Sequence, residues 1–221
     1  MSQSKFYRLF IFDWEGTLGQ DTIGQALNAI VQAAFDMHLG VVDMSSARMH
    51  IASGLTHAIT TLFPSLLLYQ REKLLHSVHT ALAVKSADDY LMPGARQCIM
   101  QLFNAGAYLA IATNKGQASL QRVLHASGLD VYFSAFRSAS QVPAKPCPQM
   151  LHELMDVFSV NVHESVMIGD SVVDMEMASS IGMDVIGMDF YHIMDVELRN
   201  AGAGHVFDSY ELLLNHLGII K

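Results

Sequence analysis

Two carboxylates lie close together near the start of the chain, directly after an apolar run. The run, Phe6–Phe12, is rich in aromatic residues and ends abruptly at Asp13, which is followed by Glu15. Its length and its sudden polar end are typical of a buried parallel strand. Gly16 then allows the backbone to turn away tightly. The pattern predicts concentrated negative charge at the carboxyl end of a strand, although a single aspartate there is more often part of a solvated turn. Chemistry at this point therefore requires partners from elsewhere in the chain.

Candidate partners follow a second apolar run, Ala107–Ala112, which predicts another strand. The end of this run carries a hydroxyl, an amide and an ammonium group, from Thr113, Asn114 and Lys115. Lys145 comes later, in the segment PAKPCP, where prolines exclude a helix and hold the loop extended. Donor groups and a cation at such places suit the binding of an anion.

A second pair of carboxylates follows a third apolar run, residues 165–168. Asp170 and Asp174 have i, i+4 spacing, so they would lie on one face near the N-terminus of a helix that starts there. The chain thus offers carboxylates after two predicted strands, together with a lysine from a loop.

In this order, the residues resemble the four motifs of the haloacid dehalogenase (HAD) superfamily of phosphohydrolases. The motifs correspond here to Asp13-x-Glu15-Gly16-Thr17, to Thr113, to Lys145 and to Gly169-Asp170-Ser171-x-x-Asp174. The resemblance covers nearly the whole chain, and the segment FDWEGTL is most similar to the phosphoglycolate phosphatase-like branch. One position departs from the family pattern, which has an aspartate where this chain has Glu15.

Composition limits the classes of protein that the chain can represent. With 221 residues, of which 51% are hydrophobic and 15% charged, it can form one large domain, or one domain plus a small insert. A net charge of −8 argues against nucleic acid as a partner. No run approaches the ~20 apolar residues of a membrane-spanning helix, and the N-terminus lacks a cleavage-site pattern. We therefore expect a cytoplasmic protein that binds neither membranes nor nucleic acids. The family resemblance implies that its partner is a small phosphorylated metabolite, and we expect a monomer or a homodimer.

Helical periodicity replaces the strand pattern from Asp21 to about Lys85. Apolar residues recur there at spacings of three and four, and the predicted helices are one that ends near Gly40, one over Ser46–Leu62 and one over Pro64–Lys85. We expect a helical insert at residues 19–87 between the two parts of a catalytic core, residues 1–18 and 88–221. In the superfamily, an insert at this place is a cap domain that selects the substrate.

The segment ARMHIASGL of the insert is similar to an Arg- and Gly-containing cap segment of the phosphoglycolate phosphatase-like branch. The resemblance implies that Arg48, Ser53 and Gly54 face the substrate, and an ordinary helix surface followed by a turn explains them equally well. His76 and His79 could share a helical face, but nothing nearby completes a metal site. Cys98 and Cys147 are too few for a disulfide framework or a cysteine metal site.

From Met92 onward, strand-like and helical segments alternate. This alternation predicts an α/β fold, a three-layer Rossmann-like core with a mostly parallel sheet and helices on both faces. The further predicted strands are residues 131–136, 184–187 and 205–207, and a final helix covers residues 210–217. Such folds bind ligands at the carboxyl ends of their strands, where all four motifs fall.

The resemblance, together with the residue types, assigns a role to each motif. Asp13 would attack phosphorus, and Mg²⁺ would offset the repulsion between the two anions. The metal set would be Asp13, Glu15 through its backbone carbonyl, Asp170 and Asp174, and Asp174 would alternatively orient Lys145. Phosphoryl oxygens would be bound by Thr113, Asn114 and Lys145. Glu15 would act as general acid and then as general base.

These roles predict a Mg²⁺-dependent phosphomonoester hydrolase that works through an aspartyl-phosphate. The extra methylene of Glu15 leaves three outcomes open, namely an active, a slow or an inactive site, and restoring aspartate is expected to raise kcat. One alternative is a phosphate-binding or regulatory protein that has lost turnover through Glu15. Another is a haloacid dehalogenase, against which Asp170 and Asp174 argue because dehalogenation needs no metal cluster. Phosphonate cleavage is disfavoured because it would replace the second carboxylate.

Overall fold

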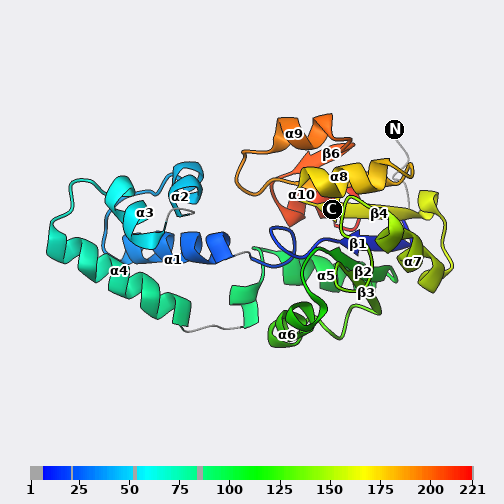
Figure 1. The fold of residues 1–221 in the computed structure, drawn as a ribbon, viewed down its shortest axis with the longest axis horizontal. Helices are drawn as coiled ribbons and strands as arrows, with labels where there is room; N and C mark the ends of the chain where they lie inside the picture. Colours follow the sequence, from blue (N-terminus) through cyan, green and yellow to red (C-terminus); the bar gives the residue numbers. More distant parts are fainter. Residues whose placement is uncertain (1–6, 21, 52–53, 84–86, 221) are drawn as a thin grey trace. The chain divides into compact units, whose positions relative to one another are not determined.

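The computed structural model describes residues 7–20, 22–51, 54–83 and 87–220. The chain forms two compact units, one of Met1–Gly19 with Leu91–Lys221 and one of Gln20–Tyr90 (Figure 1). The second unit starts one residue after, and ends three residues after, the helical insert expected at residues 19–87. Its function as a cap stays a prediction.

The first unit is built on a six-stranded, fully parallel sheet. Its strands in chain order are β1 Leu9–Phe12, β2 Tyr108–Thr113, β3 Ala135–Ser138, β4 Ser165–Gly169, β5 Asp184–Met188 and β6 His205–Phe207. Their order across the sheet is β3-β2-β1-β4-β5-β6. The predicted α/β fold with a mostly parallel sheet is confirmed.

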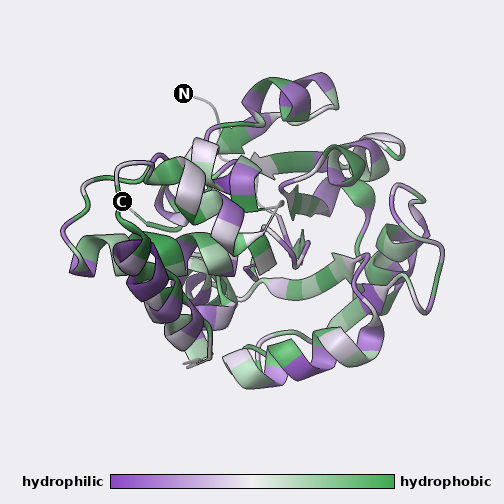
Figure 2. Cartoon of the chain, turned by 60° about the vertical axis from the view of Figure 1, so that its left-hand side comes forward, coloured by the Kyte–Doolittle hydropathy of each residue, from purple (hydrophilic) through white to green (hydrophobic). Residues whose placement is uncertain are grey.

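Strand β1 lies in the middle of the sheet because all four of its side chains are apolar and buried. Since side chains alternate along a strand, Leu9 and Ile11 enter one core while Phe10 and Phe12 enter the other. Each such burial contributes about 1.5–3 kcal/mol relative to exposure. In Figure 2 the strands are mainly green, the colour of hydrophobic residues, whereas the helices carry both colours.

Helices cover both faces of the sheet. The core that contains Phe10 and Phe12 is completed by α5 Ala95–Asn104, α6 Gln117–Ser127 and α10 Tyr210–His216. The other core is completed by α7 Gln149–Phe158, α8 Val172–Ser179 and α9 Asp195–Asn200. This arrangement gives the three layers that were expected.

The strand order creates a switch point between β1 and β4. From β1 the sheet grows through β2 to β3 on one side, and from β4 it grows through β5 to β6 on the other. Loops that leave β1 and β4 therefore diverge at the carboxyl edge of the sheet, which is where open α/β sheets bind ligands. The register pairs Phe12 with Ile168, so the residues that follow these two strands start side by side.

The second unit contains α1 Thr22–Asp36, α2 Met44–Ile51, α3 Leu55–Leu62 and α4 Leu68–Ala83. Helix α1 packs against α4, and α2 packs against α3. A short 3-10 helix, Ala87–Tyr90, follows α4. In α1, Leu27, Ile30 and Ala34 are buried, as their spacing predicted. No helix of the described part of the chain is long and apolar enough to cross a membrane.

Two helix predictions in this unit are wrong in detail. The helix expected over Ser46–Leu62 is two helices, because Gly54 adopts φ 105°, a left-handed conformation that interrupts helical geometry. The helix expected to begin at Pro64 begins four residues later, at Leu68, after a turn. Ser53 and Lys85 lie outside the described residues.

Three further boundaries in the first unit differ from expectation. Phe6, the predicted start of β1, lies outside the described residues. The run at residues 131–136 was expected to be a strand, but β3 begins only at Ala135, and Val131 is exposed. Helix α8 starts at Val172, so Asp170 precedes the helix and does not share a helical face with Asp174.

Candidate active site

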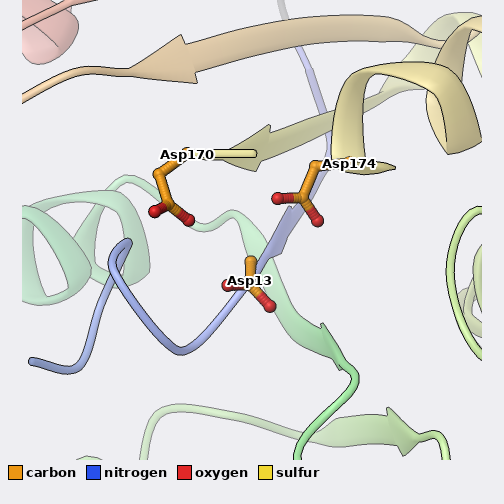
Figure 3. Close-up of side chains that lie close together, drawn as sticks. All are labelled: Asp13, Asp170 and Asp174. Atoms are coloured by element: carbon orange, nitrogen blue, oxygen red, sulfur yellow. The ribbon is translucent and has the colours of Figure 1, made fainter. Parts of the chain in front are cut away.

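Three carboxylates meet at the switch point of the sheet (Figure 3). Asp13 follows β1, Asp170 follows β4 and Asp174 lies in the first turn of α8. Each offers an oxygen within 4.8 Å of the others. Asp13 and Asp174 are buried, and the backbone N–H of Asp13 donates to the carbonyl of Ile168 at 2.9 Å. The three residues were predicted to meet at this edge of the sheet, and they do, although Asp170 lies in a bend and not in a helix.

Asp174 is held in place by the start of α8. Its Oδ2 accepts a hydrogen bond from the Ser171 hydroxyl at 2.5 Å and one from the Ser171 backbone N–H at 3.2 Å, which forms a capping box. Gly169 allows this arrangement, because a Cβ at that position would lie 2.5 Å from the Asp174 carboxyl carbon. In this segment, Gly169 thus leaves room for the Asp174 carboxylate, and Ser171 orients it.

Asp170 is packed against the loop that follows Asp13. The Thr17 hydroxyl donates to Asp170 Oδ1 at 3.1 Å. Gly16 has φ 80°, and a Cβ there would overlap the Asp170 carboxylate. The loop therefore needs a glycine both for its backbone conformation and for its close approach to Asp170.

Lys145 supplies the positive charge of the group. Its Nζ lies 2.6 Å from Asp13 Oδ1 and 2.6 Å from Asp174 Oδ1, and its side chain is 2% exposed. Its backbone N–H donates to Asn114 Oδ1 at 2.9 Å, which ties the lysine loop to the segment after β2. The contact with Asp174 is the one that the sequence suggested for orienting this lysine.

Burial and mutual repulsion shift the pKa values of this group. It raises the pKa of Asp13 from 3.8 to about 6, against the opposing effect of the Lys145 ammonium. Burial, together with the charges of Asp13 and Asp174, also raises the pKa of Asp170 well above its usual range. Burial alone would lower the pKa of the Lys145 ammonium, but the two adjacent carboxylates raise it. The group is therefore short of positive charge.

The group has three carboxylates and only one ammonium, so its oxygen atoms suit the binding of a divalent cation. Mg²⁺ prefers oxygen ligands and is commonly bound by one or two carboxylates. Lys145 already contacts one oxygen of Asp13 and one of Asp174, which leaves the second Asp13 oxygen and the Asp170 carboxylate as the strongest candidate ligands. In the described part of the chain this is the one group of three or more acidic, histidine or cysteine side chains close enough to hold a metal.

Thr113 and Asn114 lie beside the acidic group, at the end of β2. Thr113 is buried, and its hydroxyl oxygen accepts a hydrogen bond from the backbone N–H of Lys115 at 3.1 Å. The Asn114 side chain holds the lysine loop, as described above. The same segment thus positions both the expected anion donors and Lys145.

Glu15 lies outside the acidic group. Its Oε1 accepts a hydrogen bond from Lys115 Nζ at 2.7 Å, and the Glu15 side chain is 50% exposed. The sequence placed Lys115 after a strand but gave it no role. A signal was nevertheless present, since Lys115 follows β2 at the same edge of the sheet as Glu15 follows β1.

The remaining predicted site residues belong to the helical unit. Arg48 lies in α2, and Gly54 is the N-cap of α3. His76 and His79, for which no metal site was predicted, lie in α4. The part that Arg48 and Gly54 play in binding a substrate stays a prediction.

Fold and site together define a doubly wound α/β enzyme whose carboxylates lie at the switch point of the sheet. Comparison with known families agrees, because the family model described as haloacid dehalogenase-like hydrolase matches residues 7–182. The chain therefore belongs to this family of hydrolases, and the predicted superfamily is confirmed.

Individual relatives point to one branch of the family. A phosphoglycolate phosphatase of Mesorhizobium japonicum is 28% identical over 82% of this chain and 82% of its own length. One of Haemophilus influenzae is 30% identical, but the match spans 58% of this chain and 57% of that enzyme. The solved structure of a hydrolase from Pseudomonas syringae has a TM-score of 0.61 and 26% identity, over 96% of this chain and 99% of that one.

Proposed function

We propose that the protein is a Mg²⁺-dependent phosphomonoester hydrolase that acts through an aspartyl-phosphate on Asp13. The observation that carries the proposal is the buried group of Asp13, Asp170, Asp174 and Lys145 at the carboxyl ends of β1 and β4. Such a group combines a nucleophile, a cation and candidate metal ligands within hydrogen-bonding reach of one another.

The reaction needs two displacements at phosphorus. In the first, a carboxylate oxygen of Asp13 bonds to phosphorus, and the bond to the leaving oxygen breaks. In the second, water attacks the same phosphorus, which releases phosphate and restores the Asp13 carboxylate. Lys145 holds Asp13 in place and offsets charge during both steps. Bound Mg²⁺ would supply further charge neutralisation for the phosphate, and its ligands would be Asp13, Asp170 and the backbone carbonyl of residue 15.

The donors beside Asp13 suit the oxygens of the transferred group. Thr113 is the last residue of β2, Asn114 follows it directly, and β2 lies next to β1 in the sheet. We assign them to bind the phosphoryl oxygens, where charge builds up in the transition state. Their position at the end of a buried strand keeps them in place before substrate arrives.

Glu15 would protonate the leaving oxygen and then accept a proton from the attacking water. Its pairing with Lys115 gives the longer side chain a defined position, which supports a retained role. The same pairing also supports a second candidate, a phosphate-binding protein without turnover, if the ion pair keeps Glu15 away from the leaving oxygen.

For the substrate we propose a small phosphorylated metabolite of the phosphoglycolate type, on the strength of the names of the relatives. The helical unit would act as the cap that selects it, with Arg48 and Gly54 facing the substrate. A panel of phosphorylated metabolites, assayed for phosphate release, would identify the compound that is hydrolysed with the highest kcat/KM.

The test of the proposed function is hydrolysis of p-nitrophenyl phosphate with Mg²⁺ or with excess chelator, followed by mass spectrometry after rapid acid quench. We expect activity with Mg²⁺ and a phosphate adduct on the peptide that contains Asp13. Asp13→Asn should retain less than a few per cent of the wild-type rate, because no other carboxylate of the group follows β1. Full activity of Asp13→Asn would refute the nucleophile, and full activity in chelator would remove the metal. Binding of phosphate without any turnover would favour the second candidate.

A further inference from the structure

A tyrosine from the last helix reaches under the loop that follows Asp13. Tyr210 is the first residue of α10, and its hydroxyl donates to the backbone carbonyl of Thr17 at 2.8 Å. The Tyr210 side chain is almost completely buried, and Thr17 is fully buried. These two residues are separated by 193 positions in the chain, so the contact is made only in the folded unit.

Thr17 connects this contact to the acidic group. Its backbone carbonyl accepts from Tyr210, while its side-chain hydroxyl donates to Asp170 Oδ1 at 3.1 Å. One residue earlier, Gly16 lies directly against the Asp170 carboxylate. The loop is therefore bound on one side by Tyr210 and packed on the other side against a candidate metal ligand.

Tyr210 is itself fixed by its surroundings. Its ring lies 5.4 Å from that of Phe190, and α10 packs against α5 and β6. Burial, followed by the nearby Cys98 and the carboxylates of Asp170 and Asp13, raises the pKa of the Tyr210 hydroxyl well above its usual range. The hydroxyl is therefore protonated at neutral pH and can donate to the Thr17 carbonyl.

We propose that Tyr210 is a positioning residue that holds Asp170 for metal binding through Thr17. The inference rests on the proposed metal site, and it adds a residue outside the part of the chain that the family model matches, which ends at residue 182. Removing the hydroxyl leaves the Thr17 carbonyl buried without its donor, so the loop can move. Asp170 then loses its fixed orientation.

The test measures Mg²⁺ binding without substrate. The melting temperature of the purified protein is followed over a MgCl₂ titration, and the fluorescence of Trp14, the single tryptophan of the chain, reports on the loop itself. Tyr210→Phe should raise the Mg²⁺ concentration for half-maximal stabilisation by about 10-fold, the lower end of what the loss of a residue supporting a metal ligand costs. The rate at saturating Mg²⁺ should fall much less.

Tyr7→Phe is the matched control. Its hydroxyl also makes a long-range hydrogen bond, to Asp184 Oδ2 at 2.7 Å, but far from the acidic group along the sheet. This variant should lose stability without any change in the half-maximal Mg²⁺ concentration. An equal Mg²⁺ response of Tyr210→Phe and the wild type would overturn the inference, as would an equal shift in both tyrosine variants.

Thr17 variants test the second link. Thr17→Val should weaken Mg²⁺ binding and Thr17→Ser, which keeps a hydroxyl, should restore it. If Tyr210 acts through Thr17, the double variant Tyr210→Phe/Thr17→Val should weaken binding by less than the product of the two single effects. Independent effects would overturn this route, and so would equal binding by the two Thr17 variants. A wild-type protein that does not respond to Mg²⁺ at all would overturn the proposed metal site together with the inference, a result distinct from failure of the tyrosine variant alone.

Discussion

Replacing Lys145 by methionine would show how much the acidic group depends on its one buried cation. The Lys145 ammonium contacts Asp13 and Asp174 at 2.6 Å each, and the lysine and Asp174 side chains are 2% and 0% exposed. Methionine keeps much of the volume and removes the charge. Breaking a buried ion pair by deleting one partner costs about 3–5 kcal/mol, because the other charge stays buried without compensation.

This loss converts into a measurable change in melting temperature. For a chain of this length each kcal/mol corresponds to about 2–4 °C, so Lys145→Met should melt about 6–20 °C below the wild type at pH 8. Differential scanning calorimetry or a thermal shift assay without added metal measures it. Mg²⁺ should stabilise the variant more than the wild type, because the metal then supplies the missing positive charge.

The effect should depend on pH with a definite sign. The pKa of Asp13 is raised in the folded state from 3.8 to about 6, so the folded state binds its proton more tightly than the unfolded chain does. The contribution of Asp13 to the free energy of unfolding is therefore largest below about pH 4. It is lost as the pH rises through about 6, and the free energy of unfolding falls by about 3 kcal/mol over this range. Without the Lys145 ammonium, which lowers the pKa of Asp13, the Asp13 carboxylate takes up a proton even more readily, so the gap in melting temperature between variant and wild type should shrink at pH 5.

Lys115→Met provides the control, because it removes the same charge from an ion pair near the surface. Glu15, its partner, is 50% exposed, and such pairs contribute about 0–1 kcal/mol. Its melting temperature should fall by no more than about 4 °C, with little dependence on pH. A Lys145→Met protein that melts no lower than Lys115→Met at pH 8 would refute the view that Lys145 stabilises the buried carboxylates.

Two further predictions concern the metal and the acid. Asp170→Ala should raise the Mg²⁺ concentration needed for activity by more than about 100-fold, and Asp174→Ala by about 10–100-fold, in titrations of initial rate; equal effects of the two changes would contradict the assignment of Asp170 as the direct ligand. Glu15→Gln should lower kcat for alkyl phosphates and spare activated aryl phosphates, which need little protonation. The sequence alone favoured a rise in kcat for Glu15→Asp, but the Lys115 contact reverses this expectation. The shorter carboxylate cannot keep that contact, so kcat for alkyl phosphates should fall by about 10-fold, and an increase in kcat would show that Glu15 is misplaced.

Local signals were sufficient to predict most of the first unit. Strand β6 has the predicted bounds, because polar and glycine residues border a short apolar run. The prediction failed at residues 131–134, which form a loop before β3, and apolar side chains of that loop pack on the core. Tyr132 packs on Phe103 with ring centroids 5.3 Å apart, and Phe133 packs on Phe12 at 6.5 Å. Apolarity alone does not distinguish such a loop from a strand.

The acidic group was predictable, whereas its support was not. Asp13 and Asp170 each follow an apolar run, and parallel strands bring such positions to one edge of a sheet. The hydrogen bond from Tyr210 to Thr17 has no counterpart in local sequence, because it joins the ends of the unit and depends on how α10 packs. Contacts of this kind arise from tertiary structure, and no periodicity or spacing in the sequence predicts them.

Glu15 shows how the structure changes the meaning of a departure from a family motif. From sequence, the extra methylene left an active, a slow and an inactive site open, and a misplaced acid was favoured because no compensating residue was evident. In the folded unit that methylene carries the carboxylate to Lys115 Nζ at 2.7 Å, on an exposed side of the site. A fourth carboxylate inside the group around Asp13 would add repulsion where burial already raises pKa values. The length of Glu15 and the position of Lys115 therefore fit one another, since together they keep an ionisable group that is two residues from the nucleophile in sequence outside the most crowded negative charge.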